Sequence, residues 1–193
     1  MSKELFGYLS VVFASVGYST YIWSIVKGTT KPHAFSWGVW SILMAIIFFA
    51  QLSKGAAAGA WVTGYSAAIC VVITVFAILR GEKNITRSDC VAFAGALATI
   101  PIWYFTHNPL GAVILATIID AFAYYPTFRK SWHRPYEETP YLYMVDCTKW
   151  IVSFFALGNY SFTTLFYPLF CIAANSSLAL MIFTWRVLSG RIK

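Results

Sequence analysis

The sequence is dominated by long apolar stretches separated by short polar loops. Seven of them have the length that a helix needs to cross a bilayer, about 20 residues. These stretches are Leu5–Val26, Phe35–Ser53, Ala57–Leu79, Cys90–Thr106, Leu110–Phe128, Tyr141–Leu157 and Phe162–Trp185. With 59% hydrophobic and 11% charged residues, the chain has too few polar residues to cover a soluble globule. The sequence therefore predicts an all-α integral membrane protein embedded in the lipid bilayer.

The basic residues indicate how the predicted spans are oriented. Eleven Lys and Arg residues fall on one side of the spans, against only Lys3 and Lys54 on the other. Because cytoplasmic loops are enriched in Lys and Arg, we expect the N-terminus outside and the C-terminus in the cytoplasm. The net charge of +7 is thus a topology signal and does not predict a nucleic-acid partner. Trp37 and Trp40, at the start of the second stretch, are predicted to anchor it at the membrane interface.

A shift of the sequence by 103 residues reveals an internal repeat. It aligns Tyr21 with Tyr124, Lys27 with Lys130, Lys31 with Arg134, Pro32 with Pro135 and Ser36 with Thr139. We therefore expect a first three-helix repeat in residues 1–80 and a second in residues 109–193. Residues 81–108 form the linker loop and fourth helix between them. A single connecting helix gives both repeats the same orientation, so the predicted repeat is parallel.

A short motif near the end of the fifth stretch suggests a family. The segment Pro126–Lys130 reads Pro-Thr-Phe-Arg-Lys, and Trp23–Lys27 takes the same place in the first repeat without the proline. With the three-plus-one-plus-three arrangement, this motif resembles that of the SWEET and PQ-loop superfamily, with Thr in place of Gln. The resemblance implies a seven-helix carrier. Sugar-carrying members place an Asn midway along the third helix of each triplet; Asn175 is similar to that residue, whereas positions 70–72 of the first triplet hold no Asn.

Three ionisable residues lie well inside predicted spans, namely Asp120, Asp146 and Lys149, and all belong to the second repeat. Such residues cost several kcal/mol in a membrane, so they usually have a partner or a role. Asp146 and Lys149 are three positions apart and share a helix face, which predicts either a structural ion pair or a substrate site. Asp120 is then left without a charged partner, or forms a hydrogen bond with Tyr124 one helical turn later. Desolvation and the second carboxylate favour protonation of one Asp, as a proton-coupled carrier requires.

Other polar residues complete the predicted site. Asn175, near the middle of the last stretch, can donate and accept hydrogen bonds, either to a substrate or between helices. Pro126 interrupts the hydrogen-bond ladder of its helix and, with Thr127, is predicted to act as a hinge. Tyr21 and Tyr124 lie near the cytoplasmic ends of the two leading helices and would act as gates if they face inward.

These features favour a carrier that moves a small polar solute by alternating access and is coupled to a proton. Asp120, Asp146, Lys149 and Asn175 would form its site. A receptor or sorting protein with the same fold, in which Lys149 meets a ligand carboxylate, is the alternative. A retinal-binding pigment using Lys149 or an intramembrane hydrolase using both Asp residues fits less well. The sequence predicts no soluble enzyme, cofactor or metal site, and it leaves homo-oligomer formation open.

Overall fold

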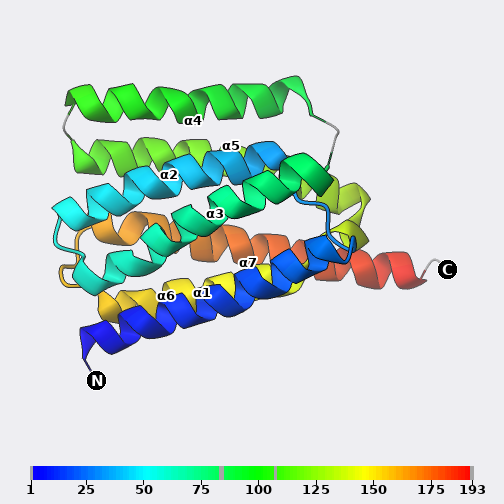
Figure 1. Cartoon of the computed structure of the whole chain (residues 1–193), viewed down its shortest axis with the longest axis horizontal. Helices are drawn as coiled ribbons and strands as arrows, with labels where there is room; N and C mark the ends of the chain where they lie inside the picture. The colour runs from blue at the N-terminus through cyan, green and yellow to red at the C-terminus, as the bar shows by residue number, and fades with distance from the viewer. Residues whose placement is uncertain (1, 83–84, 107, 192–193) are drawn as a thin grey trace.

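The computed structural model describes residues 2–82, 85–106 and 108–191, which are helical with short connections (Figure 1). Its α-helices are α1 (Lys3–Val26), α2 (Ala34–Ser53), α3 (Trp61–Arg80), α4 (Arg87–Thr106), α5 (Pro109–His133), α6 (Pro140–Ala156) and α7 (Phe162–Arg191). The 3-10 helices η1 (Ala57–Ala60) and η2 (Pro135–Glu137) lie just before α3 and α6. The all-helical prediction is thus confirmed for these ranges. Positions 83–84 and 107 of the predicted linker unit lie outside them.

Five of the described helices are long and apolar enough to cross a membrane. They cover Lys3–Val26, Ala34–Ser53, Ala57–Arg80, Pro109–His133 and Phe162–Leu188, close to five of the predicted stretches. The helices α4 and α6 are not among them, although the sequence predicts both as spans. The helix α6 has 17 residues and carries Asp146 and Lys149, which reduce its hydropathy. The structure is consistent with an integral membrane protein.

The helices lie side by side in a bundle, with α4 along one edge (Figure 1). The leading helix α1 packs against α3 and α6, whereas α5 packs against α7 and α2. The neighbours α2 and α3 contact each other, as do α6 and α7. If α1, α2 and α3 are exchanged for α5, α6 and α7, each of these contacts becomes another of them; for example, the contact of α1 with α3 becomes that of α5 with α7. The edge helix α4 touches α2 and α5.

At the end of the bundle where α1 begins, two tight turns close against each other. We call residues 54–60 and 157–159 the turn seal. Within it, the N–H of Gly158 donates to the carbonyl of Ala56 at 3.1 Å. Leu157 lies directly over Gly59, where a Cβ atom would come within 2.6 Å of the leucine Cδ2 and 3.0 Å of its Cα. The leucine side chain could rotate away, but the contact with its backbone would push the two turns apart, so the close approach favours glycine.

Candidate functional site

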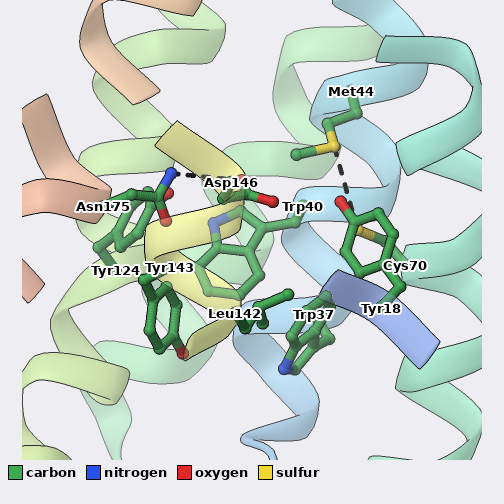
Figure 2. Close-up of a pocket in the computed structure, with 10 residues that line it drawn as sticks. All are labelled: Tyr18, Trp37, Trp40, Met44, Cys70, Tyr124, Leu142, Tyr143, Asp146 and Asn175. Carbon is green, nitrogen blue, oxygen red and sulfur yellow. Dashed lines mark hydrogen bonds between the residues drawn. The ribbon is translucent and has the colours of Figure 1, made fainter. Parts of the chain in front are cut away.

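A small cavity lies in the middle of the bundle, between helices of the two predicted repeats (Figure 2). Its volume is about 20 Å³, which is enough for about one water molecule. Its wall consists of Tyr18, Trp37, Trp40, Met44, Cys70, Tyr124, Leu142, Tyr143, Asp146 and Asn175. Half of these residues are aromatic, and Asp146 is the one Asp, Glu, Lys or Arg among them. The cavity therefore combines a carboxylate with a wall of rings.

The two tryptophans of α2 belong to this wall. Trp37 and Trp40 are only 3% and 5% exposed, and their rings meet edge to face with centroids 5.0 Å apart. The prediction that they anchor α2 at the membrane interface is therefore wrong. Their spacing from each other and from Met44 places all three on one face of the helix. Two rings on one face of a helix already rich in apolar residues are a signal from which the sequence could have predicted that Trp37 and Trp40 point inward.

The ion pair predicted on α6 is present, with Lys149 fully buried and the Asp146 side chain 12% exposed. The Nζ atom of Lys149 lies 2.6 Å from Oδ1 of Asp146. It also donates to the hydroxyls of Tyr18 at 2.8 Å and Ser66 at 3.1 Å. An ammonium has three N–H donors, so each donor of Lys149 has an acceptor within the protein. Lys149 is therefore directed toward α1 and α3 and holds Asp146 in place, while Asp146 itself borders the cavity.

Asn175 of α7 joins this cluster from the other side. Its Nδ2 atom donates to Oδ2 of Asp146 at 3.3 Å and to the carbonyl of Cys171 at 2.8 Å. The carboxylate of Asp146 is thus held between the Lys149 ammonium on its own helix and the Asn175 amide on a neighbouring helix, the second of which Figure 2 shows. Three of the four predicted site residues are brought together in this way.

Asp120 lies apart from that cluster, behind the cavity wall. It is fully buried, and neither of its carboxyl oxygens has a hydrogen bond in the described part of the chain. The bond to Tyr124 considered from the sequence is accordingly not formed. The indole of Trp40 and the hydroxyl of Tyr167 are the neighbouring donors. Because the Trp40 ring also lines the cavity, this residue connects the buried carboxyl to the cavity.

The predicted hinge lies within a continuous helix. Pro126 is buried inside α5, which extends to His133 and so passes beyond the predicted end at Phe128. Proline lacks the N–H that would bond to the carbonyl of Phe122, four residues back. At the neighbouring carbonyl, that of Ala123, the hydroxyl of Ser36 donates a hydrogen bond at 2.8 Å, and it accepts one from Thr127 at 3.4 Å. The hinge position is therefore tied to the start of α2.

The two predicted gate tyrosines occupy different places. Tyr124 lines the cavity, and its ring centroid lies 5.0 Å from that of Trp40. Tyr21 is fully buried and packs on Trp37 at 5.1 Å, but it is not among the described lining residues. Tyr124 is thus part of the cavity wall, whereas Tyr21 supports the wall from behind.

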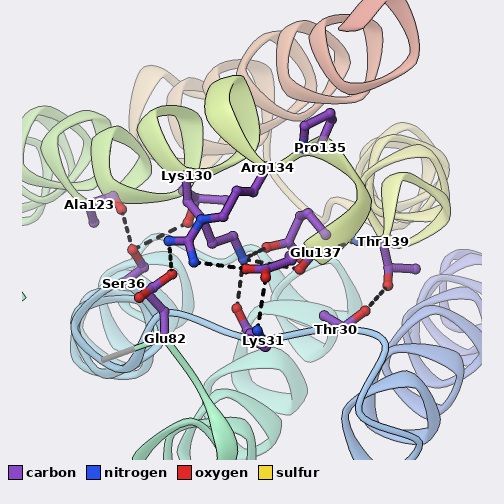
Figure 3. A network of polar contacts seen from close by, with 12 residues as sticks. Thr30, Lys31, Ser36, Glu82, Ala123, Lys130, Arg134, Pro135, Glu137 and Thr139 are labelled. Atoms are coloured by element: carbon purple, nitrogen blue, oxygen red, sulfur yellow. Dashed lines mark hydrogen bonds and ion pairs between the residues drawn. The ribbon is translucent and has the colours of Figure 1, made fainter. Parts of the chain in front are cut away.

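Charged side chains from distant loops close the end of the bundle opposite the turn seal (Figure 3). We call this cluster the basic-end network; it comprises Lys31, Glu82, Lys130, Arg134, Glu137 and Glu138. Lys130 is buried, forms an ion pair with Glu138 and donates to the carbonyl of Lys31 at 2.7 Å. Arg134 pairs with Glu82 and Glu137. The network connects the α1–α2 loop, the α3–α4 loop and the α5–α6 loop.

A buried histidine links the linker helix to the same end. His33, just before α2, places Nε2 at 3.3 Å from Oδ2 of Asp89 on α4, and both side chains are buried. Arg129 of α5 also reaches Asp89 at 3.4 Å. Burial lowers the pKa of His33 from its ordinary value, and the positive charges of Lys130 and Arg129 add to this effect against the opposing effect of Asp89 and Glu82.

We predict that stability declines as the pH falls below about 6.5, the ordinary pKa of histidine. The unfolded chain binds a proton at His33 near that value, while the folded chain keeps the ring neutral, so acidification favours the unfolded state. His33→Gln should reduce this loss at pH values below about 6.5. Unfolding midpoints across this range measure the effect, with exposed His133→Gln as the control. Equal pH dependence in wild type and His33→Gln would contradict the prediction.

Comparisons with protein-family models, curated proteins and solved structures give no match.

Proposed function

We propose that this chain is a SWEET-like membrane carrier, in which two parallel three-helix repeats joined by α4 move a small polar solute by alternating access. The carrying observation is a central cavity with a separate closure at each end of the bundle. Alternating access needs such a site at the repeat interface, with two closures that open in turn. The helix contacts support the repeat, because the largest contacts within and between the triplets are preserved when the first triplet is exchanged for the second.

The two closures differ in chemistry and would open differently. The turn seal is held by backbone contacts and close packing at Gly59 and Gly158. The basic-end network is held by ion pairs, which water can replace when the loops separate. Pro126 and its partner Ser36 lie beside that network and supply a place for α5 to bend. The count of basic residues assigns the network end to the cytoplasm.

Asp120 is the group that we propose carries a proton. In the described part of the chain, neither carboxyl oxygen of Asp120 has a hydrogen bond or a cationic partner. A buried carboxylate of this kind is costly, and binding a proton removes its charge. Asp146, by contrast, is neutralised by Lys149. Asp120 is therefore free to gain and lose a proton as the wall formed by Trp40 moves.

Replacing Asp120 with Asn is expected to abolish solute-driven proton movement. Asn keeps the shape of the side chain but cannot exchange a proton, so coupling should vanish while the fold persists. The measurement uses vesicles that contain purified protein and a pH-sensitive dye. Inward gradients of glucose, alanine or choline are applied in turn, and the internal pH is followed.

Thr117→Val is the matched control, because Thr117 lies one turn earlier on α5, is buried, and donates its hydroxyl to the carbonyl of Val113 on the same helix. This variant should retain the wild-type pH change. Undiminished coupling in Asp120→Asn would show that another group carries the proton. If no solute in the panel moves through wild-type vesicles although one binds, the receptor alternative replaces the carrier.

A further inference from the structure

We propose that the central cavity binds a small organic cation with an alkylated or quaternary ammonium head; this deepens the carrier function proposed above and rests on it. The rings of Trp37, Trp40, Tyr124 and Tyr143 converge on the cavity beside the carboxylate of Asp146 (Figure 2). Aromatic faces carry partial negative charge and attract ammonium groups, and cages of such rings are suited to quaternary ammonium ions. The wall thus offers both a cage and a counter-charge.

Lys149 already demonstrates this chemistry inside the protein. Its ammonium lies 4.7 Å from the ring centroid of Tyr18 and 5.1 Å from that of Trp150, in addition to its contact with Asp146. Because all three of its N–H donors are in use, it has no donor left for an incoming anion. A carboxylate ligand would have to break this cluster, whereas a cation leaves it intact.

The charges buried around the cavity also favour a cation. Asp120 and Asp146 against Lys149 leave a net charge of about −1 when both carboxylates are ionised. A bound monovalent cation restores neutrality, and so does a proton on Asp120. Trp40 lies between the two positions. Its ring lines the cavity, and its indole N–H lies beside the carboxyl of Asp120. Cation and proton are therefore expected to exclude each other, which predicts exchange of one for the other across the membrane.

The composition of the wall distinguishes an organic from an inorganic cation. Metal ions such as Ca²⁺ and Mg²⁺ require about six or more oxygen ligands, including water. Asp146 and Asn175 supply few oxygens here, and the remaining lining is mostly aromatic and apolar. The cavity of about 20 Å³ holds about one water molecule, so in this proposal the ligand binds only after one of the two ends opens and the wall moves apart.

Cys70 offers a native reporter, because it lines the cavity. The test uses the full chain with Cys90, Cys147 and Cys171 replaced by Ser, in vesicles of phosphatidylethanolamine and phosphatidylglycerol. The rate at which methyl methanethiosulfonate modifies Cys70 is measured with increasing choline. The matched probe is 3,3-dimethylbutan-1-ol, which has the shape of choline with carbon in place of the charged nitrogen. Choline is expected to protect Cys70 at a concentration at least about tenfold lower than this alcohol.

Three outcomes overturn the proposal: equal protection by the alcohol, stronger protection by acetate, or none by choline. Asp146→Asn should weaken protection by choline alone; if that variant does not fold, the comparison of probes on the parent protein still decides. In vesicles, an inward choline gradient should raise the internal pH as protons leave. Choline protection without any flux would leave the cation site standing and remove the carrier function. Flux of neutral solutes without choline protection would instead support the carrier function and exclude the cation site.

Discussion

Lys149→Met is expected to lower the free energy of unfolding by about 3–5 kcal/mol, the cost of leaving one member of a buried ion pair alone. Met preserves an unbranched apolar side chain but removes the ammonium. Asp146 then stays buried without its cation, and Tyr18 and Ser66 lose their donor. Denaturant unfolding of the purified protein in mixed micelles, followed by helical circular dichroism, measures the loss.

The double variant Asp146→Asn, Lys149→Met tests the reason for that loss. With no charge left in the pair, it should recover most of the stability, because a matched neutral pair avoids the desolvation cost. Exposed Lys27→Met, at the end of α1, is the control for removing a lysine and should change little. A double variant as unstable as Lys149→Met alone would show that packing, and not the unpaired carboxylate, determines the effect.

Local patterns predicted the helices well, and the exceptions have physical causes. Apolar length and the turn residues at Gly55, Pro32 and Gly158 mark where helices end, and the described boundaries lie close to the predicted ones. The largest differences are at the ends of α7 and α5, which reach Arg191 and His133 instead of the predicted Trp185 and Phe128. Apolar length placed these ends too early, because the last turns of both helices carry charged side chains, such as Arg186 and Lys130, whose partners lie in distant loops.

The contacts of the site could be predicted from the sequence only where the two interacting residues lie close together on the same helix. The three-residue spacing of Asp146 and Lys149 predicted their ion pair, which is present. The pairing of Arg134 with Glu82 joins loops that no local pattern connects. In the sequence, Lys and Arg residues in these loops indicated only the orientation of the spans, so the basic-end network was not predicted. The inward position of Trp37 was missed for a related reason, since tryptophan near a helix end fits both a membrane interface and a cavity wall.

Gly158→Ala is expected to open the turn seal. An added Cβ would lie 2.5 Å from the carbonyl oxygen of Gly55 and 3.2 Å from the Cβ of Ala57. The first contact is with backbone and cannot be relieved by a side-chain rotation. Moving the turn away would break the bond from the Gly158 N–H to Ala56. Overpacking of this kind costs about 1–3 kcal/mol, and in a carrier that cost applies to the state in which the seal is closed.

The consequence is a shift between states, which distinguishes a gate from an ordinary packing contact. With Cys70 as the only cysteine, Gly158→Ala should increase its modification by a membrane-impermeant thiol reagent about tenfold, for a cost near 1.4 kcal/mol. The increase should occur only when the reagent is added on the side of the turn seal, because the basic-end network still closes the other side. Gly95→Ala is the control, since among the described side chains the added Cβ would first meet Ile119, at 3.9 Å. Faster modification from both sides would instead mean general loosening of the bundle, and an unchanged rate would mean that the turn seal does not control access to the cavity.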